Sequence, residues 1–174
     1  MWQKLSRGYP LRLELFPLAL LAFTLYLTIS SYASLPDHVP AHFNFQGVPD
    51  RWGGRGEVII FPVLSFFLYC LFIGITVALS VVKDPKSMIN LPSRMKAALT
   101  VAQAEGLRVV LLRSLFALKM LTLGLLAYLA FTTIQVAAGR ATSIGVYLLV
   151  FVAAILAVAG YMVWRSLRLA LRGK

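Results

Sequence analysis

The chain has 174 residues, of which 60% are hydrophobic and only 13% charged, and its mean hydropathy is +0.82. These values lie well to the apolar side of an ordinary soluble domain. The single cysteine, Cys70, lies within an uncharged run, which excludes an internal disulfide and a CxxC metal site. The formal net charge of +11 would suggest a nucleic-acid partner for a soluble protein, so the basic residues must be placed relative to the apolar runs.

Four apolar runs are long enough to cross a bilayer, which takes about 20 residues of helix. They cover residues 15–33, 58–82, 115–136 and 144–164. The sequence therefore predicts an all-α integral membrane protein with four transmembrane helices. A cleavable signal peptide is the alternative for the first run, because basic residues precede it and Ser31-Tyr32-Ala33 resembles a cleavage site. A span is favoured because the run is longer than the usual signal core.

Lys and Arg gather on one side of the predicted bilayer. Thirteen of the seventeen lie in the N-terminal segment, in the connection over residues 83–114 or in the C-terminal tail. The opposite side holds only Arg51, Arg55 and Arg140. Positively charged flanks stay in the cytoplasm, so both termini are predicted to be cytoplasmic, in a bacterial inner membrane. The basic charge then serves topology and contact with the lipid bilayer, and no nucleic-acid partner is expected.

The runs divide the chain into three parts. Residues 1–82 form a two-helix unit whose outer loop covers residues 34–57. Residues 83–114 form a basic cytoplasmic connection that opens with a turn at Asp84-Pro85 and is partly an interfacial helix. Residues 115–174 form a second two-helix unit with a basic tail. Lys119, about one turn inside the third run, is expected to snorkel to the interface, and a buried partner such as Glu14 is the alternative.

The outer loop holds both histidines of the chain, His38 and His42, and three of its six acidic residues. These three are Asp37, Asp50 and Glu57. The loop also has three prolines and four glycines, which exclude a long helix. His38 and His42 therefore cannot form the two-ligand pair of a helical zinc site, since Pro40 lies between them.

Residues 41–46 alternate in polarity and are predicted to be extended. One side would carry His42, Asn44 and Gln46, and the other would carry Phe43 and Phe45 against the membrane boundary or the helix tops. A tight turn is predicted over residues 47–50, with the Asp50 carboxylate accepting hydrogen bonds from nearby backbone N–H groups.

A combined motif runs through this loop as Leu35-Pro36, Pro40, His42-Phe43-Asn44, Gly47 and Pro49-Asp50. Over about residues 13–82 the chain resembles the bacterial membrane family called domain of unknown function 1648, which includes immunity proteins against a secreted peptide toxin that delays sporulation. The resemblance implies a membrane part that binds the toxin and, in consequence, holds a transcriptional repressor at the membrane. It marks as ligand-binding or loop-structuring the positions Pro36, Pro40, His42, Asn44, Gly47 and Asp50.

Three functions fit these observations. The first, which we favour, is a non-catalytic binding, immunity or signalling protein whose outer loop recognises a peptide or lipid-like ligand, with a cytoplasmic regulator or a second copy as a further partner. The second is a metal-dependent or acid–base enzyme at the outer leaflet, using His38, His42 and Asp50. Asp37 and Glu57 would complete its ligand set. In the third, His42, Asn44 and Asp50 only satisfy one another and the loop backbone.

Overall fold

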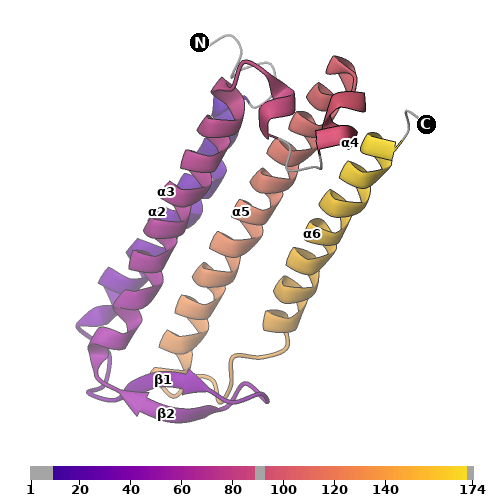
Figure 1. Cartoon of the computed structure of the whole chain (residues 1–174). Helices are drawn as coiled ribbons and strands as arrows, with labels where there is room; N and C mark the ends of the chain where they lie inside the picture. The colour runs from indigo at the N-terminus through magenta and orange to yellow at the C-terminus, as the bar shows by residue number, and fades with distance from the viewer. Residues whose placement is uncertain (1–9, 89–92, 172–174) are drawn as a thin grey trace.

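The computed structural model describes residues 10–88 and 93–171. Four long helices form a bundle that has a two-stranded sheet at one end and both chain termini at the other (Figure 1). All four are long and apolar enough to cross a membrane, which confirms the four helices that the sequence predicts. They are α2 (Leu15–Tyr32), α3 (Ile60–Val81), α5 (Val101–Ala137) and α6 (Tyr147–Leu171). The sheet shows that the fold is mostly but not entirely helical.

Short 3-10 turns lead into the first two long helices. The turn η1 (Leu11–Glu14) precedes α2, and η2 (Arg55–Ile59) precedes α3. Pro17 and Pro62 lie in the first turns of these helices, where a missing N–H removes no intrahelical hydrogen bond. Both prolines therefore mark helix starts within runs that are otherwise uniformly apolar.

The connection after α3 begins as the sequence predicts and then departs from the prediction. Asp84 accepts hydrogen bonds from the N–H groups of Lys86 and Ser87, which opens η3 (Pro85–Met88). A short helix, α4 (Ser93–Ala98), follows, and residues 89–92 between them lie outside the described part of the chain. Helix α5 runs through residue 114 without a break, so the predicted end of the connection falls inside a helix.

The start of α5 is fixed by a capping box. The Thr100 hydroxyl accepts from the Gln103 N–H at 3.1 Å, and the Gln103 side chain accepts from the Thr100 N–H at 2.8 Å. The 37 residues of α5 give a length of roughly 55 Å, against roughly 30 Å for the hydrocarbon core of a bilayer. The helix is therefore longer than a span of the hydrocarbon core requires, and its first residues lie at the end of the bundle where the termini lie (Figure 1).

Helix α5 is the central element of the bundle, in contact with α2, α3, α6 and the sheet. Helix α6 packs chiefly on α5 and has no buried residue. At the hairpin end of the α5–α6 pair, the ring centroids of Tyr128 and Phe151 are 5.8 Å apart. At the other end, the Gln103 amide donates a hydrogen bond to the Leu169 carbonyl at 3.2 Å. The remaining surface of α6 is therefore available to lipid.

An ion pair lies in the interior of the bundle. The ammonium of Lys119 on α5 is 2.5 Å from a carboxylate oxygen of Glu14 on η1, and Lys119 is fully buried. The ring of Tyr69 on α3 lies under the same ammonium, with its centroid 5.6 Å from Nζ. The snorkelling expected for Lys119 is therefore wrong. A buried carboxylate is within reach, so the ammonium pairs inside the bundle instead of extending to the interface.

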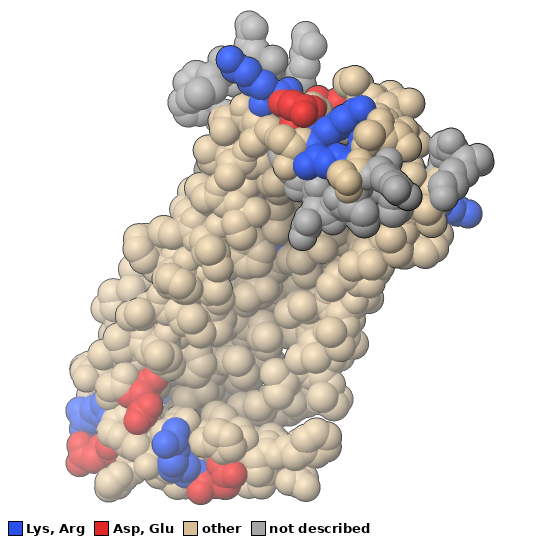
Figure 2. Space-filling view, in the orientation of Figure 1, with Lys and Arg blue, Asp and Glu red and all other residues tan. Residues whose placement is uncertain are grey.

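Charge is sparse over the middle of the visible surface of the bundle (Figure 2). Figure 2 shows Lys, Arg, Asp and Glu gathered at the two ends of the visible face, with an almost uncharged band between them. Tyr69 is near the middle of the uncharged run over residues 58–82. Glu14, Tyr69 and Lys119 therefore join three segments of the chain at a depth where an isolated charge would be costly.

Replacing Lys119 by methionine should destabilise the bundle by about 3–5 kcal/mol, because it removes the ammonium that pairs with the buried Glu14 carboxylate. The free energy of unfolding, measured in detergent micelles by far-ultraviolet circular dichroism, checks this. The double variant Glu14→Leu with Lys119→Met removes both charges and should recover most of the loss. Equal stability of the single variant and the wild type would contradict an essential pair.

Candidate functional site

The loop between α2 and α3 folds into a β-hairpin at the end of the bundle away from the termini (Figure 1). Strand β1 (Val39–Phe43) pairs antiparallel with β2 (Pro49–Gly53). The paired residues are Val39 with Gly53, Pro40 with Trp52, His42 with Arg51, and Phe43 with Pro49. Ala41 and Asp50 have no partner in this register, so each strand carries one extra residue and the ladder is bulged on both sides.

Asn44 builds the turn of the hairpin. Its side-chain oxygen accepts hydrogen bonds from the N–H groups of Gln46 and Val48, both at 3.0 Å, and its carbonyl accepts from the Gly47 N–H at 2.9 Å. The turn therefore covers residues 44–47, and its predicted position over residues 47–50 is wrong. Asparagine forms this kind of turn because its short side chain reaches the backbone two residues ahead.

Asp50 bonds a side chain rather than the backbone. Its Oδ1 lies 2.6 Å from Nδ1 of His42, which joins the two strands across the bulges. The predicted bonds from Asp50 to backbone N–H groups are therefore replaced by this pair. The side chains are 60% and 43% exposed, and a pair this exposed contributes at most about 1 kcal/mol to stability. Nε2 of His42 forms no hydrogen bond with any described residue, so it can meet a ligand.

Gly47 docks the tip of the hairpin on the loop between α5 and α6. Its carbonyl accepts from the Ile144 N–H at 2.9 Å, and the Ile144 carbonyl accepts from the Tyr128 hydroxyl. Gly47 has a φ of +76°, and a Cβ added to it would lie 3.1 Å from the Ile144 side chain. A left-handed backbone and close contact therefore both require glycine here.

The base of the hairpin is held by an apolar cluster under the helix ends. Leu35, Val39, Val58 and Ile134 are buried together, and Pro40 beside them is also buried. The Arg55 guanidinium donates to the Asp37 carboxylate at 2.9 Å across the same base. Of the remaining motif positions, Pro36 is exposed and makes no hydrogen bond across the hairpin.

The candidate metal ligands are not brought together. Among the residues that the structure describes, no group of three His, Cys, Asp or Glu side chains could hold a metal ion. Asp37 pairs with Arg55, Asp50 pairs with His42, and the Glu57 side chain lies against Gly53. His38 is exposed and takes no part in these contacts. The metal-enzyme hypothesis therefore gains no geometric support from this loop.

Apolar side chains project from the hairpin. Phe45, at the turn, is 97% exposed, Trp52 is 51% exposed and Val48 is 44% exposed. Phe43 is half-buried, so the two phenylalanines do not share one side as the alternation predicts. The alternation stops at Asn44 because the chain leaves the strand there and turns.

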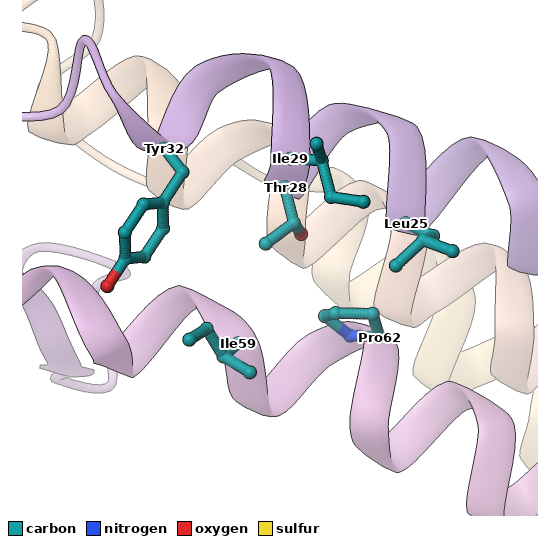
Figure 3. A pocket seen from close by; sticks show the side chains of 6 residues that line it. All are labelled: Leu25, Thr28, Ile29, Tyr32, Ile59 and Pro62. Carbon is teal, nitrogen blue, oxygen red and sulfur yellow. The ribbon is translucent and has the colours of Figure 1, made fainter.

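An apolar groove between α2 and α3 begins beside the hairpin. Figure 3 shows side chains of the two helices facing each other around a cavity of about 350 Å³, with Tyr32 at one end. A second cavity of about 380 Å³ shares Leu25, Ile59 and Pro62 with the first and continues the groove to Leu21 and Phe66. The sequence interpretation missed this groove. A signal for close helix packing was present in Thr24, Thr28 and Ser65, small polar residues within apolar runs, and Thr28 lines the groove.

Comparison with known proteins gives a family match over the segment that contains the hairpin and the groove. A family described as Domain of unknown function (DUF1648) matches residues 19–66, which contain the hairpin and all residues that line the groove. An uncharacterized protein of Archaeoglobus fulgidus is 37% identical over 84 residues, or 48% of this chain. The chain covers only 44% of that relative's length. No solved structure matches the chain. The family match supports the resemblance for most of α2, the loop that follows it and the start of α3.

Replacing Gly47 by alanine should destabilise the hairpin by about 1–2 kcal/mol, because a Cβ is strained in the left-handed region and presses on Ile144. Hydrogen exchange of the amides of residues 44–48 and of Ile144 measures the effect. Gly54→Ala is the matched control, since its added Cβ meets nothing within 4 Å. Equal exchange in both variants would show that Gly47 is not a docking point.

Replacing Asn44 by alanine should open the turn and cost about 1–2 kcal/mol locally, because two backbone N–H groups lose their acceptor. Asp50→Asn should leave the turn amides unchanged, since Asp50 bonds only His42 there. Proteolysis at the hairpin tip, followed by mass spectrometry, distinguishes the two variants. Faster cleavage in Asp50→Asn than in Asn44→Ala would reverse these assignments.

Proposed function

We propose that this chain is a non-catalytic multi-pass protein of the cytoplasmic membrane that recognises an amphipathic, membrane-active peptide on its outer side. The observation that carries the proposal is that residues 19–66, the part matched by the family model, build both the hairpin and the groove beside it. One continuous segment thus supplies an exposed polar and aromatic loop and an apolar groove below it. Such a pair of surfaces suits a ligand with one polar and one apolar face.

The distribution of charge supports this orientation. The hairpin end carries Arg51, Arg55 and Arg140, whereas the opposite end carries most of the remaining Lys and Arg. Since positively charged flanks stay in the cytoplasm, the hairpin faces outward and both termini face inward. A secreted peptide would therefore reach the hairpin before any other part of the protein.

The chemistry of the two surfaces supports a peptide that lies at the interface. The groove is lined by aliphatic and aromatic side chains such as Ile29 and Phe66, which suit the apolar face of a helix or strand. Above it, the His42–Asp50 pair and Arg51 offer a donor, an acceptor and a positive charge to polar side chains. Phe45 and Trp52 add aromatic contacts at the depth where such rings are favourable.

The contacts of the hairpin tip could transmit peptide binding to the other side of the membrane. Gly47 contacts the loop before α6 through Ile144, and Tyr128 ties that loop to α5. Helix α5 then continues unbroken to Val101 at the end of the bundle where the termini lie. An immunity or signalling role with a cytoplasmic regulator, as in the immunity proteins that the sequence resembles, would use this connection.

The test uses the full chain in lipid nanodiscs and a panel of fluorescently labelled cationic amphipathic peptides, with empty nanodiscs as the baseline. Ile29→Trp fills the groove with a larger side chain and should weaken peptide binding roughly tenfold, which corresponds to about 1.4 kcal/mol. Asp50→Ala should weaken binding while leaving thermal stability unchanged, because its pair with His42 is exposed.

The matched control is Ile75→Trp, an exposed isoleucine of α3 that does not line the groove. Binding should be unchanged in this variant. If no peptide bound wild-type nanodiscs above the lipid baseline, or if the two tryptophan variants lost binding equally, the proposal would be wrong. Loss of a co-purifying lipid in Ile29→Trp, with peptide binding intact, would instead make the groove a lipid site.

A further inference from the structure

A second cleft lies between α5 and α6, at the end of the bundle away from the hairpin. It encloses about 350 Å³, which is at the lower end of the range for small-molecule sites. Its lining combines two arginines and a tyrosine with aliphatic side chains. The residues are Gly106, Val109, Val110, Arg113, Tyr161, Arg165 and Leu169.

The two arginines of this cleft have no counter-ion among the described residues. Neither Arg113 nor Arg165 forms an ion pair with a carboxylate in residues 10–88 or 93–171. Their neighbours are engaged: Arg108 pairs with Glu105 at 3.5 Å, and the Arg168 guanidinium lies 4.9 Å from the Trp164 ring. Two unpaired guanidinium groups that line one cleft make a site for an anion.

The remainder of the cleft is apolar, which distinguishes it from a site for a free anion. Val109, Val110 and Leu169 supply aliphatic surface, and Gly106 leaves space because it has no side chain. The cleft is between α5 and a helix that has no buried residue, so lipid can reach it from the side. An anionic group attached to an apolar chain therefore complements both parts of the lining.

The depth of the cleft agrees with a lipid headgroup. Arg165 directly follows Trp164, the last residue of the fourth apolar run, and Trp favours the membrane–water boundary. Arg113 lies before the apolar part of α5, on the side of Lys119 toward the helix start. Both arginines are thus placed where phosphate groups of the adjacent leaflet lie, and basic pockets between helices at this depth suit anionic headgroups.

We propose that this cleft binds the phosphate of an anionic phospholipid in the leaflet on the side of the termini. The guanidinium groups of Arg113 and Arg165 donate hydrogen bonds to the phosphate oxygens, and the Tyr161 hydroxyl donates another. The acyl chain lies over Val109, Val110 and Leu169. Because the two arginines come from different helices, the lipid joins α6 to α5 at the end of the bundle away from the hairpin.

Native mass spectrometry of the full chain tests this site, with phosphatidylglycerol as the probe lipid and phosphatidylcholine as the zwitterionic comparison. Phosphatidylglycerol should be retained at one copy and at higher occupancy than phosphatidylcholine. The variant Arg113→Gln with Arg165→Gln should weaken its binding on the order of tenfold, because two charge-assisted hydrogen-bonding groups are lost. Inorganic phosphate at the same concentration should not compete, since it lacks the apolar chain.

Two further double variants separate loss of the cleft from loss of charge in general. Lys83→Gln with Lys86→Gln removes the same charge at the same end but outside the cleft, and it should retain phosphatidylglycerol as the wild type does. Arg113→Lys with Arg165→Lys keeps the charge but loses the planar fork, and it should bind with intermediate affinity. Equal retention of the two lipids by the wild type, competition by phosphate, or equal losses in the arginine-to-glutamine and lysine-to-glutamine variants would each overturn the proposal. The wild-type lipid comparison decides the question even if a variant fails to fold.

Discussion

The buried pair of Glu14 and Lys119 is the constraint around which the bundle is arranged. Neither charge is stable alone among apolar helices, so η1 and α5 must approach closely enough for carboxylate and ammonium to meet, and the Tyr69 ring of α3 lies beside the ammonium. This fixes the height of α2 against α5. It also sets the position of the hairpin, because the hairpin connects the ends of α2 and α3 that lie away from the termini (Figure 1).

Helix α5 connects three features that are far apart in the sequence. It carries Lys119 of the ion pair, Tyr128 of the contact that holds the hairpin tip, and Arg113 of the basic cleft. A helix of roughly 55 Å can do this because it is longer than the membrane is thick. The family match ends before α5 begins, so the helix supports a matched unit from outside it.

Some residues of the loop motif hold the hairpin together, and others are exposed. Asn44 and Gly47 are occupied by the turn and by Ile144, and Pro40 is buried at the base. His42 and Asp50 contact each other but remain exposed, so they can contribute to recognition with little cost to folding. A structural role thus accounts for Asn44, Gly47 and Pro40, whereas the exposed pair takes part in the peptide recognition that we propose.

The sequence alone determined the four apolar helices, because a segment in lipid must satisfy its backbone hydrogen bonds internally and only long apolar helices do so here. It also located the proline turn at Asp84 and the irregular outer loop. The Thr100-x-x-Gln103 capping signal was present in the sequence and would have placed the start of α5, but the charges of residues 83–114 suggested a boundary instead. Only the tertiary structure decided that Lys119 meets Glu14, that Gly47 meets Ile144, and that two helices leave a groove. These contacts join residues distant in sequence, and local periodicity carries no information about which distant partner a side chain will find.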